Sequence, residues 1–135
     1  MCSWRYAGFG QTVSCESNEI AIGGCSSALL EDCDGHSHAI YCCKMDNFAW
    51  GTCESHHTDW GNDLKCSDGK FVESMCASRY FGECEHGSWN KADCCIGYYN
   101  NQPVAVNEDN CSWQHGHSGE KKWCVGDKVS NNRIS

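Results

Sequence analysis

Residues 15–43, CESNEIAIGGCSSALLEDCDGHSHAIYCC, decide the fold, because residues 66–95, CSDGKFVESMCASRYFGECEHGSWNKADCC, repeat their cysteine spacing with one extra residue before the last pair. Each stretch is preceded by one further cysteine, 13 residues upstream. The two complete sets are Cys2, Cys15, Cys25, Cys33, Cys42 and Cys43, and then Cys53, Cys66, Cys76, Cys84, Cys94 and Cys95. A third set starts with Cys111 and Cys124, again 13 residues apart. A fixed period of this length is the signature of a repeat architecture.

The period divides the chain into two complete modules, residues 1–46 and 51–98, and a partial third module, residues 109–135. Five positions after the second cysteine of each module stands an apolar residue, which predicts a buried strand position. These residues are Ile20, Phe71 and Val129.

Short segments such as residues 19–22 and 70–73 are bounded by Gly, Asn, Ser and Asp, as strands between turns are. No stretch keeps a helical period for about ten residues with a convincing cap. The sequence therefore predicts an all-β fold.

Cysteine is unusually frequent, with 14 in 135 residues, which is typical of a disulfide scaffold. Modules of this size seldom fold on a hydrophobic core alone. Structural zinc sites need closely spaced cysteine pairs, but the nearest non-adjacent cysteines here are 8 residues apart. We expect disulfides, and therefore a secreted, extracellular protein, because such bonds persist in oxidising compartments.

Spacing alone leaves the connectivity open, since six cysteines allow 15 pairings. The adjacent pairs Cys42-Cys43 and Cys94-Cys95 give one hint. If they lie in strands, their side chains point to opposite faces and reach two different partners.

The module resembles the repeats of the Cys/His-rich C-terminal domain of the proprotein convertase that controls LDL-receptor degradation, and the related globular head of resistin. The likeness lies in the cysteine pattern, in residues 23–27 (Gly-Gly-Cys-Ser-Ser), and in residues 33–36 running into 39–43. It covers both complete modules and is thin outside the cysteine pattern. It implies tandem small antiparallel β-sandwich modules, two complete and one partial, that bind proteins or self-associate without catalysis.

The resemblance also implies nested bridges, first to sixth, second to fifth and third to fourth. Carried over, these are Cys2–Cys43, Cys15–Cys42, Cys25–Cys33, Cys53–Cys95, Cys66–Cys94 and Cys76–Cys84. The third module departs from the pattern by lacking the last four cysteines. We expect Cys111–Cys124 as the seventh bridge, with a bond between chains as the alternative.

The formal net charge of -8 opposes binding to nucleic acid or to anionic lipid. No apolar run approaches the roughly 18 to 20 residues that a membrane span needs, so no membrane insertion is expected. Serine-hydrolase, zinc-protease and phosphate-binding motifs are absent, and all cysteines can pair. We therefore expect a non-enzyme.

Histidines two apart share one face of a strand and can chelate zinc or copper. Two pairs have this spacing, His36/His38 and His115/His117, with surface histidines as the alternative. Acidic residues in segments 59–63 and 107–110 can hold calcium weakly, although they also suit turns. We expect no cofactor, with zinc, copper or calcium as the alternatives.

Trp50, Trp89 and Trp113 are the tryptophans that we expect to be exposed, as the platform of a glycan-binding lectin; buried, they would fill a core poor in aliphatic residues. Our first hypothesis is a secreted binding or structural protein that self-assembles into a matrix or fibre. The reason for this hypothesis is the partial third module, which leaves strand edges and apolar residues such as Val125 and Val129 without partner strands. A defence or recognition lectin is the second hypothesis, and an inhibitor or receptor ligand ranks last.

Overall fold

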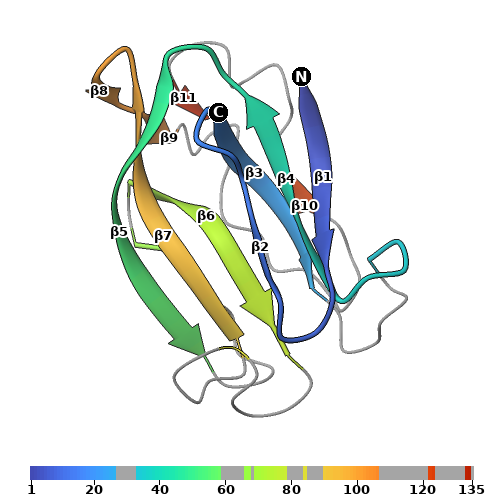
Figure 1. Ribbon diagram of the computed structural model, residues 1–135. Helices are drawn as coiled ribbons and strands as arrows, with labels where there is room; N and C mark the ends of the chain where they lie inside the picture. The colour runs from blue at the N-terminus through green and yellow to red at the C-terminus, as the bar shows by residue number, and fades with distance from the viewer. Residues whose placement is uncertain are drawn as a thin grey trace.

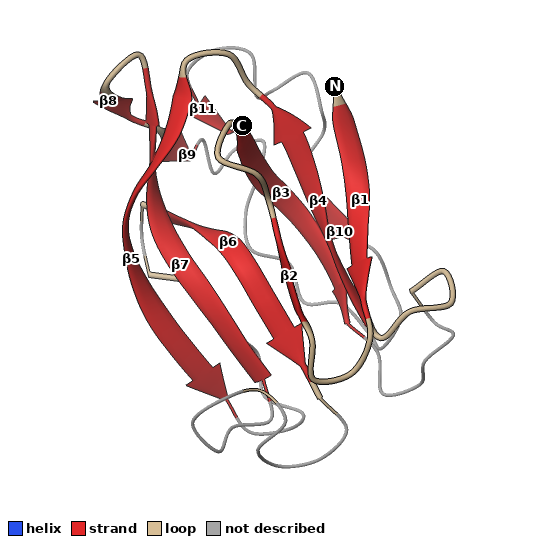
Figure 2. Ribbon diagram, viewed as in Figure 1, coloured by secondary structure: helices blue, strands red, loops and turns tan. Residues whose placement is uncertain are grey.

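The chain folds into β-strands and turns in a computed structural model that describes residues 1–26, 33–58, 66–67, 69–78, 84, 90–106, 122–123 and 133–134. The longer strands are β1 (Cys2–Ala7), β3 (Glu19–Ser26), β4 (His38–Lys44), β5 (Phe48–Thr58), β6 (Lys70–Ala77) and β7 (Asn90–Tyr99). The short ones are β2 (Thr12–Ser14), β8 (Gln102–Pro103), β9 (Ala105–Val106), β10 (Lys122–Trp123) and β11 (Arg133–Ile134). The all-β prediction is confirmed for the described residues, which contain no helix (Figure 2).

Two antiparallel sheets make up the body of the molecule (Figure 1). The first has the strand order β1-β4-β3-β10, and the second has the order β2-β6-β7-β5 with β8 folded back onto β7. A separate parallel pair joins β9 and β11. Each of the two sheets is built mainly from one cysteine repeat.

The two repeats form their sheets in the same register. Cys2 lies opposite Cys43 between β1 and β4, as Cys53 lies opposite Cys95 between β5 and β7. The equivalent strands β3 and β6 each carry a register shift six residues after the second cysteine of their repeat, after Ala21 in β3 and after Val72 in β6. Such β-bulges bend a strand and re-aim its side chains, so the repeat preserves this local geometry as well as its cysteines.

The repeats also exchange strands. β2 belongs to the first repeat but pairs with β6 of the second, with Val13 opposite Met75. β10 belongs to the third repeat but pairs with β3 of the first, with Lys122 opposite Gly24. In both cases, the residue two positions before the second cysteine of one repeat lies opposite the residue one position before the third cysteine of another repeat. Equivalent segments of two repeats therefore pair with equivalent strands in the same register.

Apolar side chains from both sheets meet in two clusters, so the sheets pack face to face as in a sandwich. The larger cluster contains the two predicted strand residues, Ile20 and Phe71, which are 0% and 5% exposed. The remaining buried members of the two clusters are Ile22, Cys43, Met45, Phe48 and Val104 in the first, and Ala7, Val13, Cys15, Ala21, Ile40 and Cys42 in the second. The third member of the predicted column, Val129, lies outside the described residues.

Among the described cysteines, six disulfides cross-link the sheets, and they form the same nested pairs that the resemblance implied. Adjacent cysteines at the end of β4 and within β7 reach different partners, in keeping with their opposite faces. Cys111 and Cys124 lie outside the described residues. Bonds in this number indicate an oxidising compartment.

Each complete repeat supplies one sheet of the sandwich, and the described strands β2 and β10 are traded between repeats. The connection between the first two repeats is short: β5 starts at Phe48, after a turn with Asn47 at a positive φ of 62°. A direct turn brings the second sheet back against the first.

Phe71→Ala tests the packing between the sheets. Removing this side chain from the larger cluster is expected to lower the free energy of unfolding by about 3–5 kcal/mol, through lost burial and the cavity left behind. Denaturant titration with the disulfides intact measures it, and a loss well under 1 kcal/mol would contradict the packing. The exposed Thr12→Ala serves as a control with little expected change.

Candidate interaction surface

The longest strand, β5, is an outer strand of the second sheet. It has 11 residues and pairs on one side only, with β7, among the strands that the structure describes. Figure 1 shows it at the outer margin of the molecule. The other outer strands are shorter: β2 has 3 residues, β10 has 2 and β1 has 6. A long unpaired strand edge is a template for pairing with another chain.

The backbone of β5 directs hydrogen-bonding groups towards this edge. Opposed residues in antiparallel strands alternate between hydrogen-bonded pairs and closer, non-hydrogen-bonded pairs. The Cα atoms of Cys53 and Cys95 are 4.0 Å apart, as expected of the closer type. The N–H and C=O groups of Cys53, and of Ser55 two residues on, therefore point away from β7 and off the sheet.

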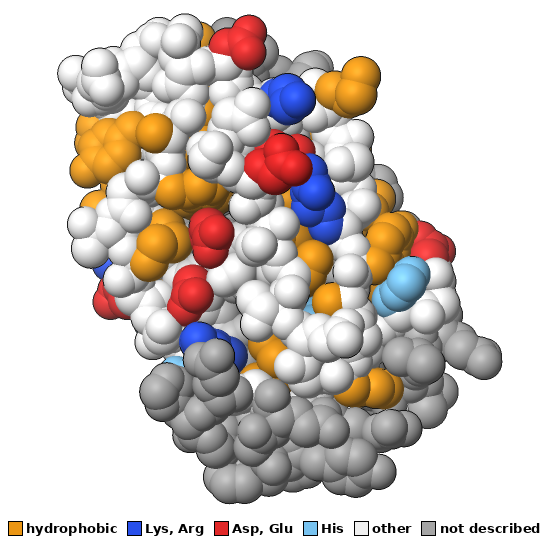
Figure 3. All heavy atoms as spheres, in the orientation of Figure 1, with side chains coloured by type: hydrophobic (Ala, Val, Ile, Leu, Met, Phe, Trp, Pro, Cys, Tyr) orange, Lys and Arg blue, Asp and Glu red, His pale blue; other side chains and the backbone are white. Residues whose placement is uncertain are grey.

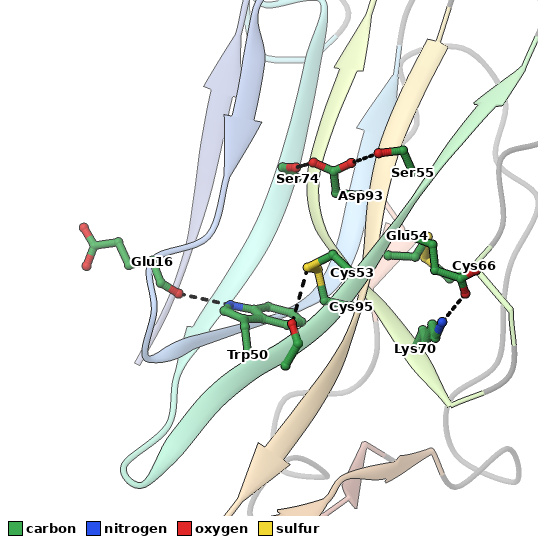
Figure 4. The surroundings of a disulfide bond; sticks show 12 residues. Glu16, Trp50, Cys53, Glu54, Ser55, Cys66, Lys70, Ser74, Asp93 and Cys95 are labelled. Carbon is green, nitrogen blue, oxygen red and sulfur yellow. Dashed lines mark hydrogen bonds and ion pairs between the residues drawn. A yellow bond between two sulfur atoms is a disulfide. The ribbon is translucent and has the colours of Figure 1, made fainter.

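Polar side chains hold β5 in place on both faces (Figure 4). On one face, Asp93 of β7 accepts hydrogen bonds from Ser55 Oγ at 2.7 Å and from Ser74 Oγ at 3.1 Å. This carboxylate thus joins three strands of the second sheet.

On the other face, Glu54 forms an ion pair with Lys70 and accepts a hydrogen bond from Ser67 Oγ at 3.0 Å. The hydrogen bond from Lys70, followed by that from Ser67, lowers the pKa of Glu54. Glu54 therefore stays ionised at neutral pH.

A β-bulge interrupts β5 between Trp50 and Cys53. Gly51 lies in it, where a Cβ atom would collide with the ring of Tyr98. Bulges twist an edge and limit uncontrolled pairing. The regular part of the edge is consequently the segment that begins at Cys53.

Charges of both signs are interspersed with apolar side chains over the described part of the face in Figure 3. This face shows no continuous basic field of the kind that nucleic acid attracts.

Trp50 does not form an exposed platform. It is partly buried, packs against both core clusters and stacks edge-on with Phe48 at a ring-centroid distance of 5.0 Å. Its indole N–H donates to the carbonyl of Glu16 at 3.3 Å. Trp50 therefore ties the two sheets together. Trp89 and Trp113 lie outside the described residues.

The predicted His36/His38 metal pair is not arranged as a chelate. His38 is fully buried, and both ring nitrogens are engaged: Nε2 with the carbonyl of Gln11 at 2.7 Å, and Nδ1 with Ser37 Oγ at 2.5 Å. His36 is exposed and stacks on Tyr6. In the part of the chain that the structure describes, no three His, Cys, Asp or Glu side chains gather as metal ligands. His115, His117 and the predicted calcium-binding segments 59–63 and 107–110 fall on undescribed residues.

His38 instead holds the residue that precedes β2, through its hydrogen bond with the carbonyl of Gln11. Because the carbonyl of Gln11 can only accept, Nε2 carries the proton of the neutral ring. Nδ1 then accepts the one hydroxyl proton of Ser37, whose Oγ lies 2.5 Å from Nδ1 and 3.3 Å from the carbonyl of Ala7. Burial lowers the pKa of His38, although the contact with Gln11 opposes the shift. The residue is thus held neutral next to the exchanged strand.

The free energy of unfolding is expected to fall on acidification because of His38. With its folded pKa below the ordinary 6.5, the unfolded chain binds a proton that the folded chain excludes. Stability from this group is complete above the ordinary value and declines below it, by up to about 1.4 kcal/mol per pH unit. Denaturant titrations between about pH 7 and pH 5 should show this slope in the wild type and in His36→Gln, but not in His38→Gln. An equal slope in all three would contradict the assignment.

Sequence reasoning missed an aromatic row on the first sheet. Trp4 and Tyr41, opposite each other on β1 and β4, stack with centroids 4.8 Å apart. Tyr6, two residues further along β1, stacks on His36 at 4.7 Å and donates to Asp34 at 2.7 Å. Both β1 aromatics pack against the cluster around Cys25–Cys33. Only the pairing register, which the nested bridges imply, could have indicated this row.

The chain matches no known protein-family model, no curated protein and no solved structure. The described residues also contain no helix long and apolar enough to cross a bilayer.

Proposed function

We propose that this chain is a secreted, non-catalytic protein that acts by binding and self-assembly, with a second copy as its partner. The observation that carries the proposal is the strand exchange: β2 on β6 and β10 on β3 follow one register rule. Repeats of this chain therefore recognise one another through backbone pairing. The resemblance to modules that bind proteins or self-associate points the same way.

The edge of β5 is the element that we assign to this association. It is the longest outer strand of the two sheets, and its regular part presents the backbone groups of Cys53 and Ser55 to the outside. A strand that is added at such an edge forms main-chain hydrogen bonds regardless of which side chains it carries. The reason to expect assembly thus moves from the partial third repeat, whose described outer strand β10 has only 2 residues, to β5, the first strand of the second repeat. Val125 and Val129 lie outside the described residues.

The symmetry of the contact decides what would be built. Two β5 edges meeting across a two-fold axis close into a dimer, whereas β5 against β1 of the next copy repeats without closing and gives a fibre. Both outer strands belong to one chain, so the head-to-tail contact is available. A matrix or fibre component is the biological role that we propose.

Ser55→Pro tests the assignment. Proline removes an N–H that points off the edge and leaves the ladder with β7 intact, as natural edge prolines do. Wild-type protein is expected to associate with rising concentration in sedimentation velocity, and Ser55→Pro to remain monomeric. Ser55→Ala is the matched control, because it loses the same hydrogen bond to Asp93 but keeps the N–H.

Disulfide mapping of both variants establishes that the bridges are unchanged. Wild-type protein that stays monomeric across concentration and pH would refute self-assembly. Association that survives in Ser55→Pro with native bridges would refute the role of β5. A closed dimer or an open series of species would distinguish the two symmetries.

A further inference from the structure

The described cysteines differ sharply in accessibility. Ten are buried, at 5% exposure or less. Cys2 is partly buried and packs against the larger core cluster. Cys53 is the one described cysteine whose residue is exposed. A thiol–disulfide exchange needs access to one sulfur of the bridge, so among the described cysteines we place the point of attack at Cys53.

The position of the Cys53–Cys95 bridge adds a direction of approach. The bridge spans directly opposed residues of β5 and β7, so its S–S bond lies across the two strands. An attacking thiolate approaches a disulfide sulfur along the line of the bond that breaks. At Cys53 this line leads off the outer edge, where no described strand lies. At Cys95, which is 0% exposed, it leads towards β6.

We propose that Cys53–Cys95 is a reversible modification site for a low-molecular-weight thiol. The thiolate RS⁻ attacks Cys53 Sγ, an R–S–Sγ bond forms, the Cys53–Cys95 bond breaks, and its electron pair leaves on Cys95 Sγ. The exchange has no net oxidation, so no further oxidant or reductant is needed. Attack by Cys95 on the mixed disulfide restores the bridge and releases RS⁻.

Exchange here has a defined structural effect. The bridge is the covalent link between β5 and its only described neighbour, β7. The other bridges of the second repeat, Cys66–Cys94 and Cys76–Cys84, do not include β5. After exchange, no described bridge joins β5 to the sheet, and its regular part beyond the bulge depends on hydrogen bonds to β7 and on side-chain contacts such as those of Glu54 and Ser55. The modification therefore loosens one outer strand while the rest of the framework stays closed.

The chain contains its own control. Cys2–Cys43 has the same place in the first repeat and the same register, with Cα atoms 3.9 Å apart against 4.0 Å. The difference is exposure, because Cys2 is covered in part by the core cluster. Geometry alone would make the two bridges react together, whereas accessibility makes Cys53–Cys95 react first.

The test is partial exchange of the native full chain with reduced glutathione, followed by acid quenching, alkylation and peptide mapping by mass spectrometry. The first product should carry glutathione on Cys53 and alkyl on Cys95, with Cys2–Cys43 intact. In Cys2→Ala/Cys43→Ala the glutathione adduct should still form, and in Cys53→Ala/Cys95→Ala the early adduct should be lost. If the latter variant does not fold, mapping of the wild type remains decisive. Simultaneous opening of several bridges, or earlier exchange at Cys2–Cys43, would overturn the proposal.

Discussion

The structure depends on two pairs of adjacent cysteines in the strands β4 and β7. Neighbouring side chains of a strand point to opposite faces, so Cys42-Cys43 and Cys94-Cys95 fix both faces of a central strand at one point along its length. Repeats of this size seldom bury enough apolar surface to fold on that alone. With both faces anchored, the register of the flanking strands is set, and the modest clusters around Ile20 and Ile40 suffice to join the sheets.

Much of the fold was predictable because it is local or periodic. The recurrent cysteines indicated the repeats, and the short segments between turns indicated strands. The aligned apolar residues marked two core positions, Ile20 and Phe71, which the structure confirms. The pairing of the cysteines came from resemblance, since spacing leaves several connectivities open.

The exchange of β2 and β10 was beyond the reach of the sequence. These donors are 3 and 2 residues long, too short for a period, and their partners lie in another repeat. The roles of His38 and Trp50 could not be predicted for a related reason. They depend on contacts with residues distant in sequence. His38 is buried against the carbonyl of Gln11, and Trp50 donates a hydrogen bond to the carbonyl of Glu16. A His-x-His pattern or a tryptophan beside a strand is compatible with either an exposed or a buried side chain.

Strand exchange has a consequence for how such a chain matures. β3 receives its neighbour β10 from a segment synthesised long after it, and β6 receives β2 from the preceding repeat. Contacts so distant in sequence form slowly, because loop closure must precede them. A newly made first repeat therefore leaves the ribosome with one sheet incomplete, so oxidation of its cysteines competes in time with the arrival of the missing strand.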